Sequence, residues 1–337
     1  MASIWVLGER GLACLQTQHA RVSWLLSEVL AVLPKARSQS PPWHTRDRVA
    51  ATAHRNQTRS QGSTRSIRIA HGLATADGQA TGIRPPHRGL EMKEFHCILQ
   101  TKGGIGKSVA AAWLAQYLLN QGRAILAIEC DQSNRTLSRY QRLQTERLDL
   151  LDKDQQIDRR RFDALMERLV EDTEPTVIMD NGQASFVPLT QYLVECDALS
   201  LLEEAGRQSY VHCVVTGGQL GPSTLSGLEQ ILAAFVDSAH VVVWRNGHFG
   251  PIDDEAYQKI VEASGAELRE PVHLDRWSKP FEDDVQEMLQ RFLTFEEAIH
   301  SPDVGLMTRQ RLTMVQRRFF GEIQFALSME PLEAAHA

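Results

Sequence analysis

Hydrophobic positions along the chain change their spacing from residue 94 onward. Short apolar runs, each about as long as a buried strand, alternate with segments in which apolar residues recur every three or four positions. This alternation is typical of parallel strands that are linked by crossover helices. We therefore predict an α/β fold with a doubly wound, mostly parallel sheet and helices on both of its faces.

The pattern also predicts where the elements lie. The strands are predicted at Phe95–Gln100, Ala124–Glu129, Thr176–Asp180, Val211–Val215, His240–Trp244 and Val272–Leu274. The helices are predicted near Ser108–Gln121, Arg160–Glu171, Leu189–Glu195, Ser223–Phe235 and Asp254–Ser264, with further helical structure over Phe281–His300 and Thr308–Leu327.

Residues 1–91 differ from the rest in composition. They carry 12 Lys or Arg against 5 Asp or Glu, whereas the remaining residues carry 24 against 37. Residues 35–91 contain few large apolar side chains, so the burial of apolar surface cannot offset the conformational entropy that this segment would lose on ordering. We predict a disordered basic extension over 1–91, a folded domain over 92–328 and a flexible tail over 329–337. The extension is a nucleic-acid-binding arm, a plain tail, or the product of a start codon assigned upstream of Met92, and we favour the last.

A glycine-rich loop with two lysines, Lys102-Gly-Gly-Ile-Gly-Lys-Ser108, lies between the first predicted strand and an apolar helix. This order of strand, loop and helix is that of a P-loop, whose backbone N–H groups and helix N-terminus surround phosphate oxygens. Lys107 should reach the β- and γ-phosphates, and the Ser108 hydroxyl should bind Mg²⁺. The predicted cofactors are ATP and Mg²⁺. The predicted nucleotide contacts in the loop are Gly103, Gly104, Ile105, Gly106, Lys107, Ser108 and Val109.

Two acidic residues follow later strands. Asp131 comes just after the second predicted strand, and Asp180 ends the apolar third strand. The carboxyl ends of parallel strands meet at the edge of the sheet where ligands bind in open α/β folds. Asp180 is therefore expected beside Mg²⁺. Asn246, after the fifth predicted strand, forms either a ligand contact or a turn before Gly247.

The two-lysine loop resembles the deviant Walker A motif of the ParA/MinD class of P-loop ATPases. The resemblance implies that Lys102 reaches the phosphates of a partner subunit in an ATP-bound sandwich dimer. It gives catalytic roles to Lys102, Lys107 and Asp131, of which Asp131 would position the attacking water or contact Mg²⁺ through water. Asn246 would hydrogen-bond the adenine. The chain departs from the motif at Thr101, often Gly, and at Glu129, often Asp, and neither change should prevent binding.

Four further stretches resemble the TraL branch of these ATPases, which is found in the transfer regions of conjugative plasmids. They are Ile178–Leu189, Val214–Gln219, Val242–Ile252 and Met307–Leu312. The resemblance covers about Met92 to Leu327. It implies an accessory ATPase of conjugal transfer or type IV secretion, in which ATP-dependent dimerisation and slow hydrolysis control binding of an unidentified partner.

Two other functions stay open, a plasmid-partition ATPase that binds DNA non-specifically and a nucleotide-dependent scaffold with negligible turnover. The late arginines that could face DNA are Arg309, Arg311, Arg317 and Arg318. The acidic excess after residue 91 opposes DNA binding. Because no apolar run is long enough to span a bilayer, we predict a cytoplasmic protein, with peripheral attachment at the membrane or cell pole left open.

Overall fold

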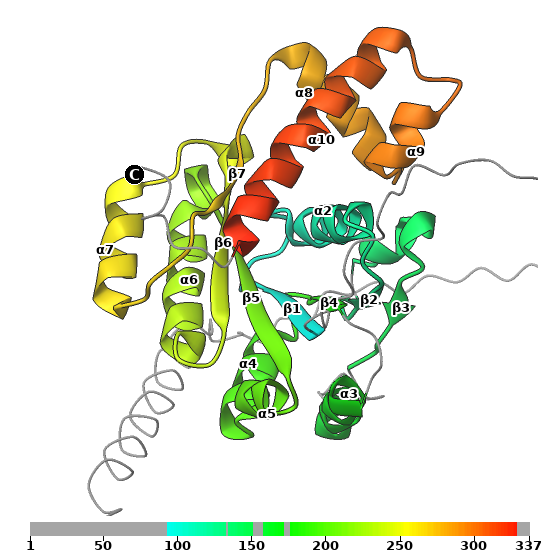
Figure 1. Cartoon of the computed structure of the whole chain (residues 1–337). Coiled ribbons are helices and arrows are strands. Elements are labelled where there is room, and N and C mark those ends of the chain that lie inside the picture. Colours follow the sequence, from blue (N-terminus) through cyan, green and yellow to red (C-terminus); the bar gives the residue numbers. More distant parts are fainter. Residues whose placement is uncertain (1–92, 133, 151–157, 172–175, 329–337) are drawn as a thin grey trace, which may run out of the picture. The chain divides into compact units, whose positions relative to one another are not determined.

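The computed structural model describes residues 93–132, 134–150, 158–171 and 176–328 (Figure 1). All of them belong to one of the two compact units into which the chain divides. The predictions for residues 1–91 and 329–337 lie outside the described residues.

Seven parallel strands form one sheet in the order β3-β2-β4-β1-β5-β6-β7. They are β1 (Lys93–Leu99), β2 (Ile125–Glu129), β3 (Glu146–Arg147), β4 (Thr176–Asp180), β5 (Arg207–Thr216), β6 (His240–Asn246) and β7 (Val272–Leu274). All six predicted strands are present, whereas the two-residue β3 is too short to be recognised from an apolar run. The strand order reverses at β1, which pairs with β4 on one side and β5 on the other.

Helices cover both faces of the sheet (Figure 1). One face is covered by α2 (Lys107–Asn120), α8 (Lys279–Gln290), α9 (Phe295–His300) and α10 (Leu306–Leu327). The other is covered by α3 (Arg159–Glu171), α4 (Phe186–Glu195), α5 (Ala198–Glu204), α6 (Gly221–Phe235) and α7 (Asp254–Ser264). Alternate strand residues enter the two cores, so that Cys97 packs on the side of α6 and Ile98 on the side of α2. The predicted doubly wound fold is confirmed.

The helices of the structure differ from the predicted ones in two places. Short α5 is an additional helix, and the helical stretch predicted over Phe281–His300 is divided into α8 and α9. The division follows from Phe292, whose φ of 53° cannot continue a helix. Thr294 then starts α9 with a capping box, because its hydroxyl accepts the amide N–H of Glu297 and the Glu297 carboxylate accepts the amide N–H of Thr294.

A buried glutamine anchors the end of β1. The Gln100 side chain is fully buried, and its Nε2 donates to the carbonyls of Val214 and Thr224, each at 3.0 Å. Its Oε1 accepts the amide N–H of Thr101 at 2.7 Å. Gln100 thereby ties the start of the glycine-rich loop to β5 and α6. Gly227 of α6 leaves the space for this side chain, because a Cβ there would lie 1.8 Å from Gln100 Oε1.

We expect Gly227→Ala to lower the free energy of unfolding by about 1–3 kcal/mol, because the new methyl group displaces a fully hydrogen-bonded side chain from a packed site. The matched control is Gly321→Ala in α10, where an added Cβ meets nothing within 4 Å. That change should stabilise the helix by about 0.5–1 kcal/mol. Urea unfolding followed by circular dichroism measures both. Equal unfolding midpoints for Gly227→Ala and the wild type would show that Gln100 does not anchor the loop.

Candidate nucleotide-binding site

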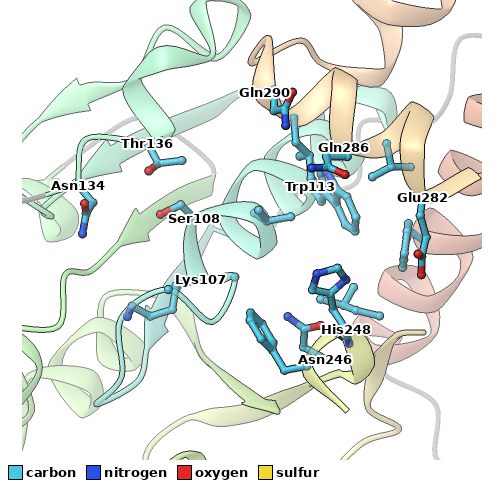
Figure 2. Close-up of a pocket in the computed structure, with 18 of the residues that line it drawn as sticks. Lys107, Ser108, Trp113, Asn134, Thr136, Asn246, His248, Glu282, Gln286 and Gln290 are labelled. Carbon is cyan, nitrogen blue, oxygen red and sulfur yellow. Dashed lines mark hydrogen bonds between the residues drawn. The ribbon is translucent and has the colours of Figure 1, made fainter. Parts of the chain in front are cut away.

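A cavity of about 1120 Å³ opens at the carboxyl ends of the strands. Its walls come from the glycine-rich loop and α2, from the loops after β2, β4, β6 and β7, and from α8. Figure 2 shows Ser108 and Trp113 along one wall on α2, with Asn246 and His248 on another. Gln286 and Gln290 of α8 lie at the end away from Lys107. The site is therefore elongated, with the glycine-rich loop at one end and α8 at the other.

The glycine-rich loop has the backbone of a phosphate-binding turn. Gly104 and Gly106 have φ values of 73° and 101°, a region that residues with a Cβ rarely adopt. Gly106 is also the N-cap of α2, and its carbonyl accepts the first helical hydrogen bond, from Ala110 N at 2.9 Å. The N-terminus of α2 therefore points its free N–H groups and positive dipole end into the loop, where an anionic ligand is stabilised.

Lys107 lies across the loop that it belongs to. Its Nζ donates to the Lys102 carbonyl at 2.6 Å, and only 7% of the residue is exposed. Burial lowers the pKa of Lys107, and the nearby Asp180 and Asp131 oppose that effect. The cation is thus held inside the site by carboxylates and one carbonyl, and a phosphate oxygen could replace that carbonyl as acceptor.

Asp180 is a buried carboxylate with unused oxygens. It is 1% exposed, and neither oxygen makes a hydrogen bond of standard geometry to a described residue. Burial is the largest cause that raises the pKa of Asp180 to about 7, with smaller contributions from Glu129 and Asp131. The Ser108 hydroxyl and Lys107 act in the opposite direction. An unsatisfied buried carboxylate beside a serine hydroxyl fits a Mg²⁺ site built from hard oxygen ligands.

Asp131 lies in the loop after β2, against the loop after β4. Its Oδ1 accepts the amide N–H of Asn134 at 3.0 Å. Gly182 packs so closely on it that a Cβ at Gly182 would lie 2.9 Å from Asp131 Cγ. Of the three residues predicted to bind the metal, Ser108 and Asp131 line the cavity, and Asp180 lies behind the lining, where it interacts with both.

Glu129 has a structural role that sequence reasoning missed. Its two carboxylate oxygens accept the amide N–H groups of Leu137 at 2.9 Å and Ser138 at 3.0 Å. These amides belong to the 3-10 helix η1 (Leu137–Arg139). Glu129 thus ties β2 to the chain that follows Asp131, and it does so with both oxygens satisfied.

The Asn246 side chain joins the loop after β6 to the glycine-rich loop. Its Nδ2 donates to the Ile105 carbonyl at 2.9 Å, and its Oδ1 accepts the amide N–H of His248 at 3.0 Å. The second contact is the turn that the sequence allowed, and the first adds a bond to the phosphate-binding loop. One Nδ2 hydrogen stays available for a ligand, so the adenine contact stays a prediction.

The predicted site residues divide into three groups. Most line the cavity, namely Gly103, Gly104, Gly106, Lys107, Ser108, Val109, Asp131 and Asn246. Ile105 packs into the core and Asp180 lies behind the lining, within range of Lys107 and Ser108. Lys102 is partly exposed outside the cavity lining, and its ammonium makes no hydrogen bond or ion pair with any residue that the structure describes.

The far end of the cavity was not predicted from the sequence. Glu282, Gln286 and Gln290 of α8 line it at spacings of four, which places them on one face of the helix. Trp113 and Trp277 add aromatic walls beside them. The four-residue spacing of polar side chains on α8 was a usable signal, but the sequence did not say that this face points at the glycine-rich loop.

Comparison with known proteins places the chain in a family. Residues 96–299 match the model of the CobQ/CobB/MinD/ParA nucleotide-binding domain. Two Escherichia coli proteins named TraL are each 38% identical to it over 240 residues, which is 70% of this chain and 99% of each relative. Among solved structures, MinD of Aquifex aeolicus is 17% identical with a TM-score of 0.40, covering 71% of this chain and 99% of its own. MinD of Pyrococcus furiosus is 17% identical with a TM-score of 0.37, covering 69% and 99%. The family model and the two TraL relatives together show that this chain belongs to the TraL proteins of the ParA/MinD class of P-loop nucleotide-binding proteins.

Proposed function

We propose that this protein is a Mg²⁺-dependent ATPase switch that acts as an accessory factor in plasmid conjugal transfer. The observation that carries the proposal is the arrangement of Lys107, Ser108 and Asp180 at one end of the cavity. A buried cation, a hydroxyl at a helix N-terminus and an unsatisfied carboxylate are what a Mg²⁺-bound triphosphate requires.

ATP would bind through the backbone amides and the lysine of the glycine-rich loop. The N–H groups at the start of α2 would donate to the phosphates, and Lys107 would leave the Lys102 carbonyl for a phosphate oxygen. Mg²⁺, when bound, would offset negative charge on the β- and γ-phosphates. Ser108 and Asp180 would hold it, and Asp131 would contact it through water or position the attacking water.

Hydrolysis would occur slowly in a sandwich dimer. Lys102 supports this part of the proposal, because its ammonium has no partner within the described residues and lies outside the cavity of its own subunit. A free cation next to the phosphate-binding loop is placed to reach the phosphates of a second copy across a two-fold axis. The homodimer would form with ATP and separate after hydrolysis, which would make partner binding depend on the nucleotide.

The conjugation partner would be recruited by the ATP-bound form, in the cytoplasm or at its membrane surface. No helix in the described part of the chain is long and apolar enough to cross a membrane.

DNA is the less favoured partner, because three of the late arginines already have acceptors. Arg311 pairs with Asp284 at 2.5 Å, Arg318 with Asp275 at 2.6 Å, and Arg309 donates to the Ser301 carbonyl at 2.7 Å.

Lys107→Ala tests the ATP assignment. We expect it to weaken Mg·ATP binding by about 100-fold, because a charge-assisted contact to phosphate is lost. Isothermal titration calorimetry measures the affinity, and the rate of plasmid transfer from cells that depend on the variant measures the biological role. Equal affinity in the variant and the wild type would overturn ATP binding at this loop. A normal rate of plasmid transfer in a variant that no longer binds ATP would show that the protein does not act as an ATP-dependent switch in transfer.

A further inference from the structure

We propose that Gln183 is a catalytic residue that orients the attacking water during ATP hydrolysis. This inference rests on the proposed ATPase function and assigns a role to a side chain that the sequence analysis did not single out. Gln183 lies in the loop between β4 and α4, three residues after Asp180. It lines the same cavity as Lys107 and Ser108.

The loop around Gln183 is anchored while its side chain is not. The Ser185 hydroxyl donates to Asn181 Oδ1 at 2.6 Å, within the same loop. Gly182 packs against Asp131. The Gln183 side chain, in contrast, is exposed and its amide makes no hydrogen bond with any residue that the structure describes. The backbone therefore presents a free primary amide to the cavity.

The Gln183 amide lies at the end of the cavity where the phosphates would bind. A Cβ added to Gly103 would lie 2.9 Å from Gln183 Oε1, so the amide rests directly over the glycine-rich loop. Gly103 follows Lys102 and belongs to the turn that would surround the phosphates.

A primary amide suits this place because it both accepts and donates hydrogen bonds. Its Oε1 can accept a hydrogen bond from the water while its Nε2 donates to an oxygen of the γ-phosphate, as glutamine does in other P-loop enzymes. The water oxygen then bonds to the γ-phosphorus as the bond from phosphorus to the β–γ bridging oxygen breaks. ADP leaves with that bridging oxygen. One proton of the water stays on the attacking oxygen, and the other passes to another oxygen of the phosphate product. Gln183 stays neutral throughout.

Gln183→Ala should lower kcat for ATP by about 100-fold, the usual cost of removing one positioned hydrogen-bonding group from a transition state. The KM for ATP and the Kd for a non-hydrolysable ATP analogue should stay within about threefold of the wild type. The reason is that Gln183 stabilises the transition state and contributes little to binding of the ground state. Gln219→Ala is the matched control. Gln219 is an exposed glutamine in the loop after β5 that does not line the cavity, and its removal should leave kcat unchanged.

A second variant tests the contact with the loop. In Gly103→Ala the new methyl group must push the flexible Gln183 amide aside, so hydrolysis should slow. In the double variant Gly103→Ala/Gln183→Ala the first change should have little further effect on kcat, because coupled residues are not additive.

The outcomes separate this inference from the proposed function. If the wild type neither binds nor hydrolyses ATP, the proposed function is wrong. If the wild type hydrolyses ATP and Gln183→Ala hydrolyses it equally fast, only the role of Gln183 is wrong. If Gln183→Ala loses affinity for the analogue in proportion to kcat, Gln183 serves binding and the catalytic role is overturned.

Discussion

Replacing Lys102 by alanine is expected to abolish ATP-dependent dimerisation and to lower turnover by about 1000-fold, while the monomer keeps its affinity for nucleotide. The reason is the division of work between the two lysines of the loop. Lys107 is buried and lies inside its own site, whereas Lys102 is partly exposed with an ammonium that is free among the described residues. A cation supplied in trans to a phosphoryl-transfer site contributes about 10³-fold or more to the rate.

Size-exclusion chromatography with a non-hydrolysable ATP analogue measures dimerisation, and phosphate release measures turnover. Lys259→Ala is the control, because Lys259 is an exposed lysine on α7 that pairs with Glu255 at 2.6 Å, outside the cavity. It should behave as the wild type in both assays. If Lys102→Ala elutes like the wild type in the presence of the analogue, the sandwich dimer is not the active form.

Mixing two inactive variants tests whether Lys102 acts in trans. Lys102→Ala keeps its own Asp131, and Asp131→Ala keeps a Lys102 that can serve a partner. In a mixed dimer one of the two sites then has both groups. The Lys102→Ala homodimer should not form and the Asp131→Ala homodimer lacks the aspartate in both sites, so turnover should come from the mixed dimers and rise well above that of either variant alone. A lysine that serves its own subunit would give no recovery.

The sequence was sufficient for the fold and for the loop because both depend on local pattern. Six of the seven strands are apolar runs whose period differs from that of the helices, namely β1, β2, β4, β5, β6 and β7. The spacing of the glycines specifies the backbone of the loop. β3 was not recognisable, because two paired residues, Glu146 and Arg147, leave no apolar pattern.

Polar residues inside the sheet were not predictable in the same way. Trp244 Nε1 donates to His212 Nδ1 at 3.0 Å, and His212 Nε2 lies 2.9 Å from His96 Nδ1, so three strands share one buried chain of hydrogen bonds. Each partner is more than thirty residues from the next along the chain. Gln100 and Glu129 likewise bond to groups that only the folded chain brings near them, so their types alone did not indicate their roles.

The α8 end of the cavity depends on tertiary packing as well. Trp113 of α2 packs on Phe319 of α10 with ring centroids 4.4 Å apart, and on Phe295 of α9 at 5.7 Å. These contacts hold α9 and α10 against α2, and α8, which packs on α10, lines the far end of the cavity. The sequence predicted helices in this region but carried no local signal for the face that they present.

Asp180→Asn is expected to have opposite effects on metal binding and on stability. The variant loses the carboxylate that would hold Mg²⁺, so Mg²⁺-dependent ATP turnover should fall by about 1000-fold, in line with the loss of a metal-held phosphoryl-transfer site. Without Mg²⁺ and nucleotide, at pH 8, the same variant should be more stable than the wild type and unfold at a higher urea concentration. The wild type must then keep a buried charge whose two oxygens are unsatisfied.

The pKa of Asp180 fixes the pH range of both effects. Burial raises this pKa from 3.8 to about 7, so the folded state binds the proton more tightly than the unfolded chain. The contribution of Asp180 to stability is therefore largest below pH 4 and is lost as the pH rises to 7. The shift sets an upper limit of about 4 kcal/mol on this loss. Because the Asn amide is also unsatisfied, we expect Asp180→Asn to gain about 1–3 kcal/mol at pH 8.

Mg²⁺ binding should have the opposite pH dependence, because the metal needs the ionised carboxylate. With a pKa of about 7, the ionised fraction rises about tenfold between pH 6 and pH 8, and the apparent affinity for Mg²⁺ in the presence of ATP should rise by the same factor. Urea unfolding in EDTA and Mg²⁺ titration at each pH measure the two trends. Asp303→Asn, at an exposed acid between α9 and α10, is the control and should change neither. A wild-type affinity for Mg²⁺ that is flat from pH 6 to 8 would show that Asp180 is not the ligand whose ionisation limits metal binding.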